Sequence, residues 1–144
     1  MSDINLLLEK YFDNYGKEYQ GFTVAPIPLH FSKMKERGFD QAFLLARQVA
    51  RFLEAPLESA LLRRISETSP QATKTKTERA NNIKGAFEIN RPELISGKDV
   101  LLVDDVFTTG ATANEASMTL KKSGSGNVYI FTLGRVVIGK GLDR

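Results

Sequence analysis

The stretch from Val100 to Thr112 constrains the fold of this chain more than any other feature of its sequence. It opens with Val100-Leu101-Leu102-Val103, a continuous apolar run that is typical of a central parallel strand buried on both faces. The pair Asp104-Asp105 ends this predicted strand, and the turn Thr108-Thr109-Gly110 precedes a helix predicted over 111–122. This uninterrupted order predicts an α/β domain whose chemistry lies beyond the carboxyl end of the strand.

Apolar residues elsewhere follow helical and strand spacings in turn. The first helix is predicted over 4–15, with Gly16 as its stop signal. The remaining predictions are a helix over 39–53 and strands over 22–26, 61–65, 86–89 and 128–133. Because strands alternate with helices, we expect a single domain over 1–144 with a central, mostly parallel sheet of about 4–5 strands flanked by helices.

Composition excludes several kinds of site. The chain has no cysteine, which excludes disulfides and cysteine-ligated metals within it, and its single histidine, His30, argues against a histidine-based metal centre. A formal net charge of +3 is too small to indicate nucleic-acid binding by itself. No signal peptide and no apolar run of about 18 residues is visible, so we expect a cytoplasmic protein without membrane insertion.

The start of the helix at 111 is a candidate anion site. The first amides of a helix lack partners within it, and the helix dipole is positive there, so Thr108 to Thr112 can hold a phosphate. Gly110 allows close approach of the backbone, and the threonine hydroxyls add donors.

The two carboxylates favour a ligand that carries hydroxyl groups as well as a phosphate, because ionised carboxylates accept hydrogen bonds from hydroxyls. A sugar phosphate meets both demands. For an isolated acidic pair, the plainer explanation is that Asp104 and Asp105 end a strand while Thr109 caps the helix. The order of the whole stretch favours the ligand site.

A proline-containing basic segment follows the strand at 22–26. Pro26-Ile27-Pro28-Leu29 is stiff, and Lys33, Lys35 and Arg37 place positive charge after it. Arg37 can bind a phosphate through two donors at once. The segment is a plausible pyrophosphate loop, with a solvated basic turn as the alternative, and His30 fits a structural or surface position better than a catalytic one.

The residues 66–77 contain no large apolar side chain, so we expect a mobile loop there. A short helical turn is expected near Thr77 or Glu78. The loop carries Gln71, Lys74 and Lys76, and Arg79 follows it.

These motifs carry a resemblance to known proteins. The stretch Val103 to Thr112 resembles the phosphoribosyl-pyrophosphate (PRPP) motif of type I phosphoribosyltransferases. Together with PIPL, RGFDQ and the stretch from Gln71 to Phe87, it is similar to the ComF family over about 24–135. Asp40 stands where asparagine is expected. The zinc module usual at the start of this family is absent, so we expect a fragment or a short member, and the start within a helix favours a fragment.

The resemblance implies a type I phosphoribosyltransferase-like fold and a set of site residues. Asp104 and Asp105 would hold the ribose hydroxyls, and Arg37 would stabilise the leaving pyrophosphate. The segment 66–79 would act as a lid. The implied substrate-binding residues are Val106, Phe107, Thr108, Thr109, Gly110, Ala111, Thr112, Pro28, Leu29, Lys35, Gly38, Gln71 and Arg79. Mg²⁺ would bind through PRPP rather than in a protein cage.

Two functions compete at this point. The first is Mg²⁺-dependent transfer of phosphoribose to a nitrogenous acceptor, with release of pyrophosphate. The second is a non-catalytic, PRPP-sensing component of DNA uptake that binds single-stranded DNA beside a competence ATPase. DNA contacts would fall on Phe31, Phe39, the nearby basic residues or the lysine-rich lid. A structural scaffold ranks below both. The acceptor and the oligomeric state stay open, with a homo-oligomer among the alternatives.

Overall fold

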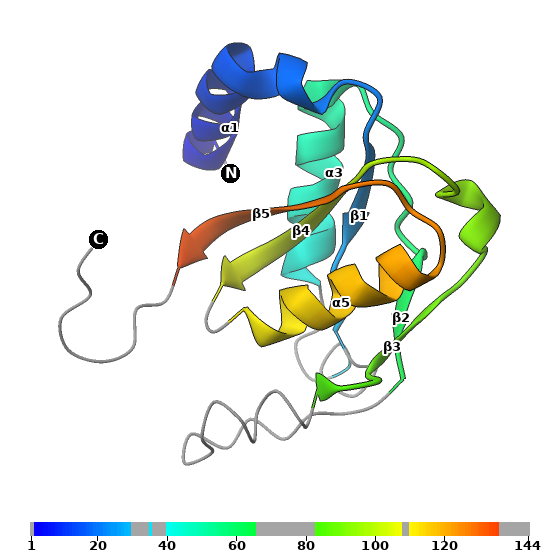
Figure 1. The fold of residues 1–144 in the computed structure, drawn as a ribbon. Helices are drawn as coiled ribbons and strands as arrows, with labels where there is room; N and C mark the ends of the chain where they lie inside the picture. The colour runs from blue at the N-terminus through cyan, green and yellow to red at the C-terminus, as the bar shows by residue number, and fades with distance from the viewer. Residues whose placement is uncertain (1, 30–34, 36–39, 66–82, 108–109, 136–144) are drawn as a thin grey trace, which may run out of the picture.

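The computed structural model describes residues 2–29, 35, 40–65, 83–107 and 110–135 (Figure 1). Its centre is a parallel sheet of three strands in the order β1-β4-β5. These strands are β1 (Thr23–Pro26), β4 (Val100–Phe107) and β5 (Val128–Arg135). The predicted central strand is confirmed, because Val100 to Val103 are each at most 1% exposed and pair with a strand on both sides.

β4 is longer than the sequence predicted. We expected Asp104 and Asp105 to end it, but it continues to Phe107. The cause is β5, which pairs with it beyond the acidic residues, with Asp104 opposite Thr132 and Phe107 opposite Arg135.

Helices cover both faces of the sheet. On one face, α1 (Ser2–Tyr15) and α3 (Gln41–Leu53) pack on a core that includes Leu101 and Val103. On the other, α5 (Ala111–Lys122) packs on a core that includes Val100 and Leu102. The alternation along β4 divides the core in this way, because successive strand residues point to opposite faces. Short 3₁₀ turns lie at Gly16–Tyr19 and Pro92–Leu94.

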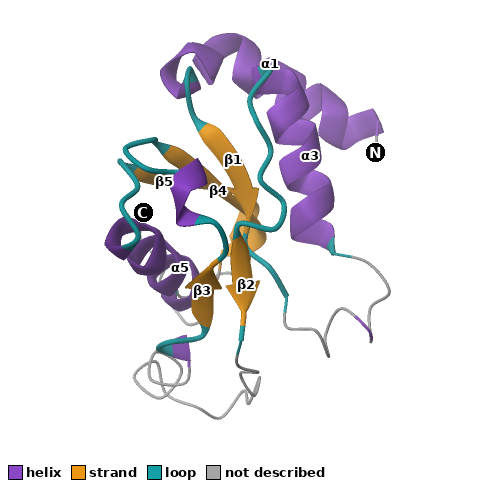
Figure 2. Ribbon diagram, turned by 90° about the vertical axis from the view of Figure 1, so that its right-hand side faces the viewer, coloured by secondary structure: helices purple, strands orange, loops and turns teal. Residues whose placement is uncertain are grey.

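Two of the predicted strands do not join the parallel sheet. β2 (Leu62–Arg64) and β3 (Phe87–Ile89) pair antiparallel in a small sheet of their own (Figure 2). Each has an exposed residue on its outer face, Arg63 and Glu88, whereas central parallel strands are buried on both faces. The expected sheet of about 4–5 strands is thus three parallel strands with a separate pair.

The start of α3 explains why Asp40 is tolerated in place of asparagine. The Phe43 N–H donates to Asp40 Oδ1 at 3.1 Å, which makes Asp40 the cap of the helix. Aspartate and asparagine cap helices about equally well. The departure from the family pattern therefore leaves this local structure intact.

Candidate functional site

The carboxyl end of the parallel sheet brings two of the sequence motifs to one edge. The Ile27 N–H donates to the Val103 carbonyl at 2.9 Å, so the chain leaving β1 is still held against β4 just before the acidic pair. Pro28 and Leu29 follow directly and are half-buried. The proline segment thus leaves β1 next to the part of β4 that carries the acidic pair, toward the carboxyl end of the sheet, where ligands of open α/β sheets bind.

The acidic pair is half-buried and internally hydrogen-bonded. The Asp105 N–H donates to Asp104 Oδ1 at 2.9 Å. Burial, together with the hydrogen bond and the negative charge of the Asp105 side chain, raises the pKa of Asp104 to about 7. Asp104 can therefore hold a proton near neutral pH, when it donates a hydrogen bond, and accept hydrogen bonds once ionised.

Arg64 is a site residue that sequence reasoning missed. It lies at the end of β2, with its Cζ 5.5 Å from the centre of the Phe87 ring. Desolvation lowers the pKa of Arg64, and the negative charge of Asp104 opposes this change, which places the guanidinium within electrostatic reach of the acidic pair.

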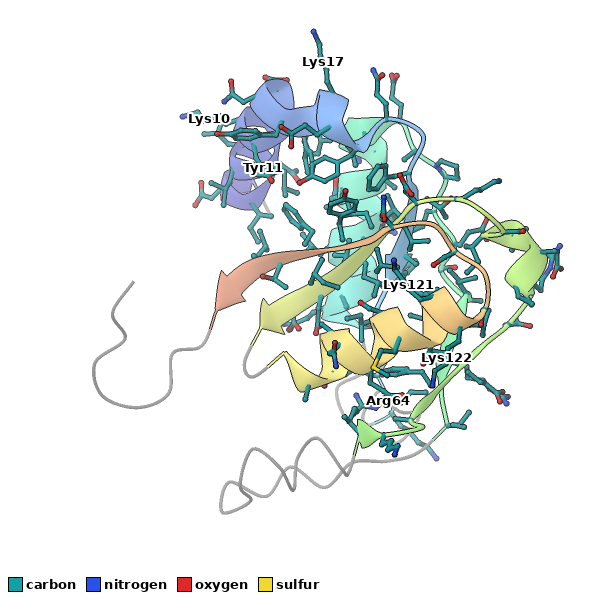
Figure 3. All side chains as sticks on the ribbon, in the orientation of Figure 1. Lys10, Tyr11, Lys17, Arg64, Lys121 and Lys122 are labelled. Atoms are coloured by element: carbon teal, nitrogen blue, oxygen red, sulfur yellow. The ribbon has the colours of Figure 1, made fainter. Side chains whose placement is uncertain are left out.

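The small sheet is also tied to α5, because the Gly85 N–H donates to Glu115 Oε2 at 3.2 Å. Figure 3 shows Arg64 on the side of α5 where β2 and β3 lie. The only available signal in the sequence was the adjacent pair Arg63-Arg64 in a predicted strand, since alternation turns one of the two inward.

The residue before α5 has a backbone conformation that suits the predicted anion site. Gly110 precedes the helix with φ 83° and ψ −2°, a left-handed conformation, and its carbonyl accepts from the Asn114 N–H at 2.8 Å. A glycine at this position has no side chain to cap the first amides of the helix. Ala111 and Thr112, both half-buried, form its first turn.

The other predicted site residues divide into two groups. Val106 and Phe107 extend β4, where they pair with Gly134 and Arg135, and Lys35 is exposed. Arg37, Gly38, Gln71, Arg79, Thr108 and Thr109 lie outside the described residues, as does the predicted lid over 66–79. The described part of the chain holds no cluster of three or more histidine, cysteine, aspartate or glutamate residues that could bind a metal.

A comparison with known protein families shows to which family the chain belongs. A family model described as "Phosphoribosyl transferase domain" matches residues 40–139, more than half of the chain. The chain belongs to the phosphoribosyl transferase domain family.

Curated relatives of this phosphoribosyl transferase domain are competence proteins. The chain is 35% identical to Competence protein F of Haemophilus influenzae over 115 residues, which is 78% of the chain and 50% of the relative. It is 34% identical to Competence protein ComFC of Bacillus subtilis over 133 residues, 90% of the chain and 52% of the relative. The resemblance to the ComF family is confirmed, and the chain spans about half the length of the curated relatives it matches.

Solved structures confirm the predicted fold class. The adenine phosphoribosyltransferase of Saccharomyces cerevisiae superposes with a TM-score of 0.60 at 14% identity, covering 94% of this chain and 68% of that one. Within the part of the chain that the structure describes, no helix is both long enough and apolar enough to cross a membrane.

Gly110→Ala is expected to weaken both the fold and ligand binding. A Cβ in the left-handed region costs about 1–2 kcal/mol, and it would obstruct the close approach that the sequence predicts between a phosphate and this backbone. Gly124→Ala is the matched control, because Gly124 has φ 99° and lies past the other end of α5. Chemical denaturation should show similar losses for both variants. Only Gly110→Ala should lower affinity for PRPP in calorimetric titration, and an equal loss of affinity in both would contradict a phosphate site at Gly110.

Proposed function

We propose that this domain binds PRPP at the carboxyl end of β4. The observation that carries the proposal is a half-buried acidic pair near the carboxyl end of β4, followed along the chain by the left-handed Gly110 and the first turn of α5. Asp104 and Asp105 would accept hydrogen bonds from the ribose hydroxyls, and the start of α5 would hold the 5′-phosphate.

We further propose that the reaction is transfer of phosphoribose to a nitrogenous acceptor. A bond forms between the acceptor nitrogen and the anomeric carbon, and the bond from that carbon to pyrophosphate breaks with its electron pair leaving on pyrophosphate. The protein's part would be orientation and charge stabilisation, in which Arg64 and the sequence-predicted Arg37 would offset the negative charge of the leaving group. Mg²⁺ bound through the pyrophosphate oxygens would supply further positive charge.

The relatives suggest where this chemistry is used. Besides the competence proteins, the chain is 31% identical over 114 residues to the DNA utilization protein YhgH of Escherichia coli. We therefore propose a role in DNA uptake, in the cytoplasm. Binding of single-stranded DNA and of a competence ATPase, without catalysis, stays the alternative proposal.

Calorimetric titration of the full chain with PRPP and Mg²⁺ tests the proposal. Ribose 5-phosphate and pyrophosphate should each bind more weakly than PRPP, because each occupies one half of the site. An absence of binding to all three would overturn the PRPP site. Release of pyrophosphate with a panel of nitrogenous bases then separates an enzyme from a binding protein.

Arg64→Ala is expected to weaken PRPP binding by roughly tenfold or more, since a charge-assisted hydrogen bond contributes about 1.5–3 kcal/mol. Arg63→Ala is the matched control, because Arg63 is the next residue in β2 but is exposed and paired with Glu88. It should bind PRPP as the unaltered chain does. Binding that falls equally in both variants, or in neither, would remove Arg64 from the site.

A further inference from the structure

β5 is the end strand of the parallel sheet, and its outer edge has no strand partner among the described residues. Figures 1 and 2 both show it beyond β4. The other end of the sheet is covered, because the Val24 N–H donates to the Pro56 carbonyl at 2.9 Å and the Glu58 N–H donates to the Val24 carbonyl at 2.8 Å. Among the described residues, the edge at β1 is thus covered by another part of the chain, whereas the edge at β5 presents a row of backbone donors and acceptors.

The β5 side chains from Val128 to Gly134 include none of the residues that usually protect such an edge. Tyr129, Ile130 and Leu133 are 47%, 37% and 38% exposed, and they lie on both faces of the strand. Natural edge strands are usually guarded by lysine, proline or an inward charge. The stretch Val128 to Gly134 contains no charged residue and no proline.

We propose that the outer edge of β5 pairs antiparallel with the β5 of a second copy of this chain. A two-fold axis through Phe131 would place Tyr129 opposite Leu133 of the copy and Ile130 opposite Thr132. Directly opposite residues share a face of the sheet. The exposed Tyr129 of each copy would therefore cover the exposed Leu133 of the other.

The strand is complementary to itself, which favours a second copy over an unrelated peptide. The exposed Tyr129 and Leu133 lie at equal spacing on either side of Phe131, as an interface between identical surfaces requires. Phe131 is held against α1 by the rings of Tyr11 at 5.6 Å and Phe12 at 5.4 Å, which fixes the face that these three residues share. With no charge between 128 and 134, no like charges meet along the pairing.

Sedimentation equilibrium of the full chain over a concentration series tests the proposal. The unaltered chain should dimerise. The variant Tyr129→Lys with Leu133→Lys should be monomeric, as should Tyr129→Glu with Leu133→Glu, because each places like charges opposite each other. An equal mixture of the two should form dimers again, which a merely destabilised fold would not do. Leu6→Lys, at an exposed position on α1, is the control and should dimerise as the unaltered chain does.

Hydrogen exchange on the unaltered chain gives a second measurement that needs no substitution. Protection of the β5 amides should rise with protein concentration. A chain that stays monomeric throughout, a mixture that does not restore dimers, or β5 protection that is independent of concentration would overturn the proposal.

Discussion

The variant carrying Asp104→Asn with Asp105→Asn is expected to lose binding of PRPP, with affinity at least about 100-fold lower. Each carboxylate is proposed to accept from a ribose hydroxyl, and hydrogen bonds to charged groups contribute about 1.5–3 kcal/mol each. Asparagine keeps the size of the side chain, and the Asp105 N–H can still donate to the oxygen at position 104. Calorimetric titration with PRPP and Mg²⁺ measures the loss.

A matched control removes two acidic charges elsewhere. Glu9 and Asp13 are exposed residues of α1, so Glu9→Gln with Asp13→Asn changes the net charge equally, far along the chain from the acidic pair. This control should bind PRPP as the unaltered chain does. Unchanged affinity in the Asp104 and Asp105 variant would remove the acidic pair from the site, even if PRPP binds elsewhere.

The single variant Asp104→Asn is expected to be more stable than the unaltered chain above about pH 7. Folding raises the pKa of this carboxyl from 3.8 to about 7, because burial and the neighbouring Asp105 disfavour the charged form. Between these values the folded chain binds more protons than the unfolded chain, so stability falls as pH rises. At about 1.4 kcal/mol for each pH unit, the cost of ionised Asp104 reaches at most about 4 kcal/mol.

Urea denaturation at a series of pH values tests the predicted direction of this pH dependence. The gain in free energy of unfolding from Asp104→Asn should be absent below about pH 4, grow between about pH 4 and 7, and level off above that. The same substitution at Asp13, which is exposed, should show no such trend. A gain that is constant with pH would mean that burial of charge at Asp104 is not its cause. If Asp104→Asn raises the free energy of unfolding while it lowers affinity for PRPP, then Asp104 serves ligand binding rather than folding stability.

The main helices and strands could be predicted from the sequence because their signals are local. The apolar run Val100 to Val103 predicted a strand buried on both faces, and the predicted helices start within two residues of α3 and at the first residue of α5. The sequence predicted that Gly110 allows close approach of the backbone. Its φ of 83° is a left-handed conformation that glycine adopts readily. In each case the information lies within a few neighbouring residues.

Three features required the tertiary structure, because each depends on residues far apart in the chain. The continuation of β4 past Asp104 needed the pairing with β5, and the separation of β2 and β3 needed their pairing with each other. The electrostatic interaction of Arg64 with Asp104 needed the small sheet to be fixed against α5.

What the sequence alone determined, then, is the order of buried strand, acidic pair, glycine turn and helix, together with the family it indicates. The fold decided which strand is central, how burial and Asp105 raise the pKa of Asp104, and which arginine lies within electrostatic reach of that carboxyl. The physical reason is that burial, charge and pairing are properties of neighbours in space, and distant segments become neighbours only in the folded chain.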